Sequence, residues 1–272
     1  MGTLQAAKSS LTVSKPQRDL QKALNILRKF RWFDCRHEQP DIVNLGRYDE
    51  SRASLATWSV IIVFNVPYYA QSSEFTCGPA CVVMVMKHFN QGIKASRRLE
   101  FEIWRQCNMI GVRGADPYGL SVPLIDAGYE VRLITKHKKV VDYDLWKRRR
   151  RRHFSADDLA LSLFGMNENR QRALKRRLAV RYKRPVVEDI VQGVDDRFVP
   201  ITLVHMGVVH SLNIPHWVVV IDADEELVTF NDPYPPKGRM GIKLPHAKFQ
   251  RMLDDIGTRI GFSPSILLVR PK

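Results

Sequence analysis

Apolar residues recur with helical spacing in the first half of the chain and in short strand-like runs in the second half. Helices are predicted over Gly78–Phe89, Arg97–Gln106 and Tyr118–Asp126. Segments rich in Val, Ile and Leu predict strands over Tyr129–Ile134, Phe198–His205, His216–Asp222, Leu227–Asn231 and Ile266–Val269. Helices first and strands after predict an α+β fold, with an N-terminal helical half packed on a C-terminal antiparallel β-sheet.

The N-terminal part follows a different pattern. Lys15–Trp32 carries Leu20, Leu24 and Leu27 at helical spacing with basic residues between them, which predicts an amphipathic helix. We interpret residues 1–56 as an extension whose helix packs on the main domain, with docking on a membrane or a partner as the alternative. A strand over Thr57–Val66 then opens a domain that we place at residues 57–272.

Composition indicates a soluble globular protein without a membrane span. Hydrophobic residues make up 44% of the 272 positions. The longest apolar run, Val60–Val66, is far too short to cross a bilayer, and the first fifteen residues lack the apolar core of a secretory signal. Four cysteines show no regular framework, which suits a reducing compartment. We therefore predict a cytoplasmic protein, with exit from the cytoplasm by an unrecognised route as the alternative. We predict no cofactor and no metal, since Cys35-Arg36-His37 has no second pair at zinc-site spacing.

Positive charge is concentrated in one segment. Between Lys147 and Arg184 there are fourteen Lys and Arg residues against three acidic residues, so most of the formal net charge of +15 lies there. We predict a basic helical insertion at about residues 147–184. One helix would start at Ser155 with Asp158 at its third position, and a second would cover Glu168–Tyr182.

The basic segment has two interpretations. It is either an anion-binding face for an acidic peptide, a nucleic acid or a membrane surface, or a solvated surface without a partner. Binding to nucleic acid has no support beyond charge, because no recognition motif and no aromatic platform accompany the basic residues.

Cys77 is the first candidate for chemistry. It stands directly before Gly78 and Pro79, and proline suits the first turn of a helix. The following Cys81–Met86 is apolar on every face, which predicts a buried helix. A thiol at a helix N-terminus feels the positive end of the dipole, so its pKa falls and the nucleophilic thiolate becomes available. An inert buried cysteine is the alternative.

A base and a carboxylate follow in the second half. His216 opens one predicted strand, Ala223–Glu226 reads as a hairpin turn, and the return strand leads directly to Asp232. The hairpin would bring the Asp232 carboxylate within reach of the His216 imidazole, which is the geometry that fixes a tautomer and stabilises an imidazolium. Four other histidines (His153, His205, His210 and His246) lack so clear a strand and carboxylate.

These motifs resemble a known group of enzymes. Gln71 with Cys77-Gly78-Pro79-Ala80, then His216-Trp217-Val218-Val219, then Asn231-Asp232-Pro233, look like the signature of the papain-like double-glycine leader peptidases that process bacteriocin precursors. The chain is most similar to the stand-alone peptidase-like relatives of that family, from about Val66 to about Val269. The resemblance implies Cys77 as nucleophile, His216 as base, Asp232 as orienting residue and Gln71 as oxyanion donor, without a cofactor.

The leading hypothesis is a cysteine peptidase or peptide acyl transferase that works through an acyl-enzyme. The resemblance implies a peptide or protein substrate with Gly at the cleaved end, and the basic charge admits an acidic one. Two alternatives stay open. One is a non-catalytic peptide-binding module on the same fold, and the other is a protein associated with anions or nucleic acids through the Arg-rich segment Lys147–Arg184.

Overall fold

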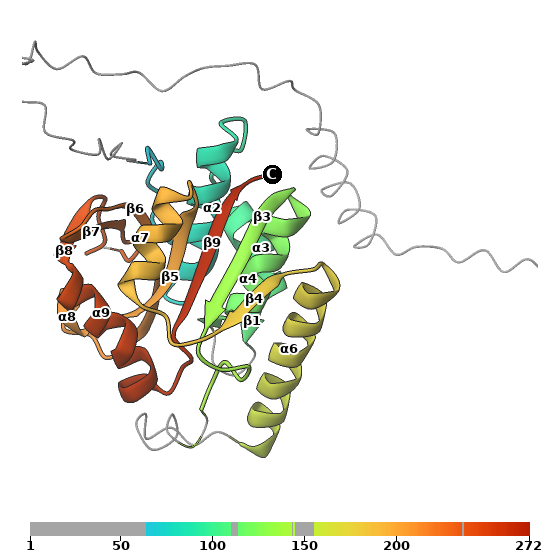
Figure 1. Cartoon of the computed structure of the whole chain (residues 1–272). Helices are drawn as coiled ribbons and strands as arrows, with labels where there is room; N and C mark the ends of the chain where they lie inside the picture. Colours follow the sequence, from blue (N-terminus) through green and yellow to red (C-terminus); the bar gives the residue numbers. More distant parts are fainter. Residues whose placement is uncertain (1–63, 110–113, 143, 145–154, 236) are drawn as a thin grey trace, which may run out of the picture. The chain divides into compact units, whose positions relative to one another are not determined.

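A computed structural model describes residues 64–109, 114–142, 144, 155–235 and 237–272 (Figure 1). The predicted extension over residues 1–56, its amphipathic helix Lys15–Trp32 and the arginine run up to Arg152 lie outside these residues. So does most of the strand predicted over Thr57–Val66. No helix in the described part of the chain combines the length and the apolar character needed to cross a membrane.

The three helices predicted in the first half are confirmed. They are α2 (Cys77–Phe89), α3 (Arg97–Cys107) and α4 (Pro117–Asp126). A polar side chain caps each of the last two: Ser96 accepts from the N–H of Leu99, and Asp116 accepts from the N–H of Gly119. A short antiparallel pair, β1 (Asn108–Met109) and β2 (Gly114–Ala115), lies between α3 and α4.

Seven strands form the main sheet in the part of the chain that the structure describes, in the order β4-β3-β9-β5-β6-β7-β8. Their bounds are β3 Tyr129–Thr135, β4 Ala179–Tyr182, β5 Val199–His205, β6 Pro215–Ala223, β7 Leu227–Asn231, β8 Ile242–Pro245 and β9 Ser265–Pro271. Neighbouring strands are antiparallel except β3 and β4, which are parallel. All five strands that the pattern predicts after residue 128 are present, which confirms the α+β class.

Helices cover both faces of this sheet (Figure 1). Side chains alternate along β6, so Trp217 and Val219 join the core beneath α2, α3 and α4, whereas Val218 and Val220 join a second core. The second core also contains residues of α7 (Val187–Asp195) and α9 (His246–Asp255), two helices that the sequence pattern did not predict. A short helix α8 (Gly207–His210) and a π-helical turn (Ile256–Ile260) complete the fold.

The predicted second helix over Glu168–Tyr182 is wrong. A single helix, α6, runs over Ala156–Lys175, with the expected capping box between Ser155 and Asp158 at its start. After the last helical residue, Lys175, and the C-cap Arg176, Arg177 has a left-handed backbone (φ 61°), and the N–H of Leu178 returns to the carbonyl of Ala173. This is a Schellman motif. Residues Ala179–Tyr182 then pair as strand β4 with β3, so the predicted apolar stripe of Leu174, Leu178 and Tyr182 does not form.

Asp116 ties α4 to α6. Its buried carboxylate accepts the N–H of Gly119 and the side-chain amide of Asn169. Gly119 is required at this junction, because an added Cβ would lie 2.6 Å from the Cα of Cys107. Asp116 and Gly119 together therefore hold the start of α4 against α3 and α6.

We expect Asp116→Ala to lower the free energy of unfolding by about 2–3 kcal/mol, because it removes a helix cap and leaves a buried amide without its acceptor. Ser96→Ala, which removes only the cap of α3, should lower it by about 1 kcal/mol. Urea unfolding at neutral pH measures both values. Equal losses for the two variants would contradict the role given to the Asn169 contact.

Candidate active site

Cys77 is the first residue of α2 and lies where the sequence predicted it, at the N-terminus of a buried helix. The residues from Cys77 to Met86 are all buried. Cys77 itself is 9% exposed, and its thiol is free. The side chain is therefore at the edge of the core, next to the N–H groups that the first turn of a helix leaves without helical acceptors.

The start of β6 packs directly on this first turn. A Cβ added at Gly78 would lie 3.0 Å from the Trp217 ring and 2.9 Å from Leu120, so only glycine allows this approach. The indole N–H of Trp217 donates to the carbonyl of Ala115 (3.1 Å), which fixes the ring. His216 directly precedes Trp217 in β6, so the contact between Gly78 and Trp217 also brings His216 close to Cys77.

His216 and Asp232 are brought together by the hairpin of β6 and β7. The register pairs Val219 with Asn231, and Asp232 follows directly after β7. The Nε2–H of His216 donates to Oδ1 of Asp232 over 2.7 Å, and the backbone N–H of Tyr234 donates to the same oxygen over 2.9 Å. Both side chains are buried. The expected contact between imidazole and carboxylate is thus present.

The charges of this cluster favour a thiolate and an imidazolium. Burial alone would raise the pKa of the Cys77 thiol. The His216 charge, a hydrogen bond from its ring and the backbone N–H groups of Trp217 and Gly78 outweigh burial, so the pKa falls below its ordinary value. Burial alone would lower the pKa of His216, but the Cys77 thiolate and the Asp232 carboxylate raise it to about 9. The shift of each group thus favours the charged form of the other.

Gln71 lies in the loop that leads to Cys77, and it is buried. Its backbone N–H donates to the carbonyl of Pro233, so this loop is joined to the segment that follows Asp232 (2.9 Å). One side-chain N–H of Gln71 donates to the carbonyl of Ser73 over 2.8 Å. An amide NH2 carries two hydrogens, and no second acceptor occurs among the described residues.

Glu100 holds this loop, and the sequence analysis did not find it. Its carboxylate, buried on α3, accepts the N–H of Ser72 (2.9 Å), the hydroxyl of Ser72 (2.5 Å) and the hydroxyl of Tyr69 (2.9 Å). These bonds fix the residues on both sides of Gln71. The only signal for Glu100 in the sequence was an acidic residue on the side of α3 that faces the core. The other charged residues of this helix conceal that signal.

His210 is the second residue whose contact the sequence analysis did not predict. It was set aside because no clear strand and carboxylate follow it. It ends α8, and its Nε2–H donates to Oδ2 of Asp232 over 2.6 Å. The Asp232 carboxylate therefore lies between two imidazoles. The signal in the sequence was weak: two histidines six residues apart on either side of a short polar loop.

The other described cysteines differ from Cys77. Burial raises the pKa of Cys81 and Cys107 well above the ordinary value, so both remain thiols. Within the described residues, no group of three or more His, Cys, Asp or Glu side chains could hold a metal ion. The absence of a metal and of a cofactor stays a prediction from the sequence.

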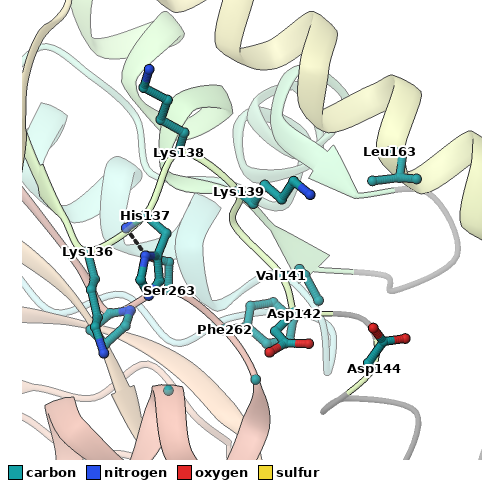
Figure 2. Close-up of a pocket in the computed structure, with 13 residues that line it drawn as sticks. Lys136, His137, Lys138, Lys139, Val141, Asp142, Asp144, Leu163, Phe262 and Ser263 are labelled. Carbon is teal, nitrogen blue, oxygen red and sulfur yellow. Dashed lines mark hydrogen bonds between the residues drawn. The ribbon is translucent and has the colours of Figure 1, made fainter.

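A separate cavity of about 800 Å³ lies between the segment after β3 and the start of β9, and it contains none of the four predicted site residues. It is lined by Lys136, Lys138 and Lys139 together with Asp142 and Asp144. Figure 2 shows the three ammonium groups pointing in different directions. The positive charges do not converge on one point, so the cavity does not define an anion site.

Several basic residues of the segment 147–184 make contacts inside the domain. Arg176 pairs with Asp126 (2.6 Å), Lys183 with Asp189 (2.5 Å) and Arg184 with Asp254 (2.6 Å). Arg172 donates to the carbonyl of Gln106. In residues 170–184, part of the charge that the sequence concentrates there therefore joins α6 and β4 to the rest of the fold.

The chain belongs to the Peptidase C39 like family, whose model matches residues 66–254. This match covers the loop of Gln71, all of α2 and the hairpin that carries His216 and Asp232. It confirms the resemblance drawn from the motifs and, with the α+β architecture, the papain-like peptidase fold. A comparison with curated proteins found no match.

Three solved structures are similar to the chain at low identity. The peptidase domain of Streptococcus ComA, a bi-functional ABC transporter, is 14% identical, with 75% of this chain and 97% of that chain covered and a TM-score of 0.36. A double glycine motif protease from an AMS/PCAT transporter, solved with a leader peptide, is 14% identical (77% and 94% covered, TM-score 0.40). A C39-like peptidase from Bacillus anthracis is 12% identical (78% and 98%, TM-score 0.40).

The charge distribution predicts how alkylation of Cys77 depends on pH. The wild-type thiolate should react with iodoacetamide at neutral pH, below the range of an ordinary thiol, because the pKa of Cys77 is lowered. His216→Phe removes the imidazolium, so the pKa of the thiol should rise and the rate at pH 7 should fall by up to about tenfold for each pKa unit. Mass spectrometry of the Cys77 peptide measures the rate. Superimposable pH curves for the two proteins would contradict the ion pair.

Glu100→Gln tests the support of the Gln71 loop. The amide cannot accept hydrogen bonds at both of its terminal atoms, so the contacts with Tyr69 and Ser72 should not all survive. We expect faster hydrogen exchange at the backbone amides of residues 69–73, with no change in β6. Glu102→Gln is the control, since Glu102 pairs with Arg98 at the surface of the same helix. Equal exchange in both variants would remove the assigned role.

Proposed function

We propose that the protein is a cysteine peptidase or peptide acyl transferase that acts on a peptide bond through Cys77, His216 and Asp232. The observation that carries this proposal is the hydrogen bond between His216 and the Asp232 carboxylate, with the Cys77 thiol at the start of α2 near enough for the His216 charge to lower its pKa. A nucleophile, a base and an orienting group in this order are the parts that acyl transfer by a thiol needs. Membership of a peptidase-like family supports the same reaction class.

The reaction follows from the charges. The Cys77 thiolate attacks the carbonyl carbon of the peptide bond, and the π electrons of the carbonyl move to its oxygen. When the tetrahedral intermediate collapses, the carbon–nitrogen bond breaks and His216 gives its proton to the leaving amine. The product is a thioester on Cys77. Water then attacks it with His216 as base and releases an acid, or a second amine attacks and a new peptide bond forms.

Gln71 and the backbone N–H of Cys77 would stabilise the oxyanion. The side-chain N–H that Gln71 does not donate to Ser73 is of the right donor type, and Cys77 contributes an N–H from the first turn of α2. Glu100 and Pro233 would hold this donor in place through the loop around Gln71. Preorganised donors of this kind lower the barrier because they do not have to reorient during the reaction.

The substrate would be a peptide or protein segment with small residues at the cleaved bond. Only 9% of Cys77 is exposed, so the carbonyl has to approach closely, and glycine allows this best. The motif resemblance to double-glycine leader peptidases favours the same residue. The net charge of +15 attracts acidic peptides, and a cytoplasmic location remains a prediction.

The alternative is a peptide-binding module that uses the fold without catalysis. Cys77→Ala separates the two functions, because it removes the nucleophile and leaves the remaining site in place. If the protein is an enzyme, wild type should cleave members of a Gly-containing peptide library and form a thioester detectable by mass spectrometry, and Cys77→Ala should do neither. Cys81→Ser serves as the control for a buried thiol outside the site. Peptide binding by both proteins without any cleavage would favour the module.

Gln71→Ala tests the oxyanion role separately from the nucleophile. Loss of one donor should lower kcat/KM for peptide cleavage by about 10²–10³-fold. Alkylation by iodoacetamide passes through no oxyanion, so the rate of Cys77 alkylation should stay near that of wild type. A parallel fall in both rates would show that Gln71 acts on the thiol or on the fold rather than on the oxyanion.

A further inference from the structure

The Asp232 carboxylate is fully buried, and its two oxygens have different partners. Oδ1 accepts from the Nε2–H of His216 (2.7 Å) and from the backbone N–H of Tyr234 (2.9 Å). Oδ2 accepts from the Nε2–H of His210 (2.6 Å), which is its one hydrogen-bond donor among the described residues. One of the two carboxylate oxygens therefore depends for its hydrogen bond on a single side chain outside the predicted site.

The fold fixes His210 in this position. Ser211 follows α8 with a left-handed backbone (φ 56°), and the N–H of Met206 donates to the carbonyl of Ile214 (3.2 Å), which closes the loop before β6. Within this loop His205 accepts the N–H of Gly207 at Nδ1, so its Nε2–H donates to Asn213 (2.9 Å). The side chain of His210 is 7% exposed as a result.

Several other groups surround this cluster. Tyr234 lies against both rings, with centroids 5.6 Å from His210 and 5.8 Å from His216. The Tyr68 hydroxyl donates to the backbone carbonyl of Asp232 (3.1 Å). Cys77 faces His216 from α2, and Asp255 of α9 lies 3.8 Å from His205 in the same loop.

We propose that His210 is a positioning residue that holds the Asp232 carboxylate ionised and oriented toward His216. A buried carboxylate oxygen without a donor is costly, so loss of the His210 bond would favour the protonated acid or a rotated carboxylate. Either change removes the partner of the His216 imidazolium. The proposal rests on the proposed function for its consequence in catalysis, but the effect on the thiol can be measured without any substrate.

His210→Gln and His210→Phe form the matched pair of variants. A glutamine amide N–H can occupy the place of the imidazole Nε2–H, whereas phenylalanine keeps the ring shape and loses the donor. We expect the acidic limb of the pH curve for Cys77 alkylation to move up by about one pH unit in His210→Phe, which is about a tenfold lower rate on that limb. The His210→Gln curve should return close to that of wild type, which a purely structural role of the ring would not explain.

The outcomes separate this inference from the proposed function. A wild-type Cys77 that reacts no faster than an ordinary thiol overturns the proposed function. Activated alkylation in wild type with an unshifted curve in folded His210→Phe overturns the role of His210 alone. An equal shift in His210→Gln and His210→Phe also overturns it, because the donor would then be irrelevant.

A second measurement keeps the proposal testable if His210→Phe does not fold. Histidine-selective ¹⁵N NMR of the wild-type protein should show protected, hydrogen-bonded Nε2–H signals from His210 and His216, beside that of His205, which donates to Asn213. Folded His210→Gln should lose the His210 signal and keep the other two. A wild-type spectrum in which the Nε2 of His210 carries no protected proton overturns the proposal.

Discussion

The close contact between Gly78 and Trp217 is the constraint on which the site depends. It joins the first turn of a buried helix to the first residues of a central strand, two segments far apart in the chain. With a side chain at position 78 the helix could not approach the strand, and Cys77 would be separated from His216. The position of the thiol is therefore determined by packing between the helical layer and the sheet, and electrostatics then acts on a geometry that packing has set.

Electrostatics in this site is organised around one carboxylate. Among the described residues, the Asp232 carboxylate has three hydrogen-bond donors, and two of them are imidazoles at opposite ends of the same loop. The interactions with these donors lower the pKa of Asp232 although burial opposes this. A stable negative charge at this position raises the pKa of His216, and the imidazolium in turn lowers the pKa of Cys77. The Asp232 carboxylate thus affects the reactivity of the Cys77 sulfur through His216.

Most of the fold could be predicted from the sequence because periodicity and turn chemistry agree in α2, α3, α4 and five strands. The basic segment could not. Its helix ends at Lys175 and is followed by Arg177 in a left-handed conformation that usually marks glycine, and β4 forms because β3 offers an edge to pair with. The helix α9 was missed because its apolar stripe (Phe249, Met252 and Leu253) is short. The stripe can be recognised as part of the core only when the second face of the sheet is known.

The site divides in the same way. Cys77, His216 and Asp232 could be found because a helix start and a hairpin place them by local rules. Glu100 and His210 could not, since each acts through a contact with a residue distant in the chain or across an irregular loop. Local signals identify the candidate groups for chemistry. The groups that hold them depend on tertiary structure, which a single sequence does not display.

The burial of α2 on all sides has a consequence for the lifetime of the reactive state. A nucleophile on a surface loop can leave and regain its reactive position through local fluctuations while the rest of the domain stays folded. Here the residues from Cys77 to Met86 are buried in a core that they share with the sheet and with the neighbouring helices. We therefore expect α2 to open mainly when the domain unfolds cooperatively, rather than by a local fluctuation of its own.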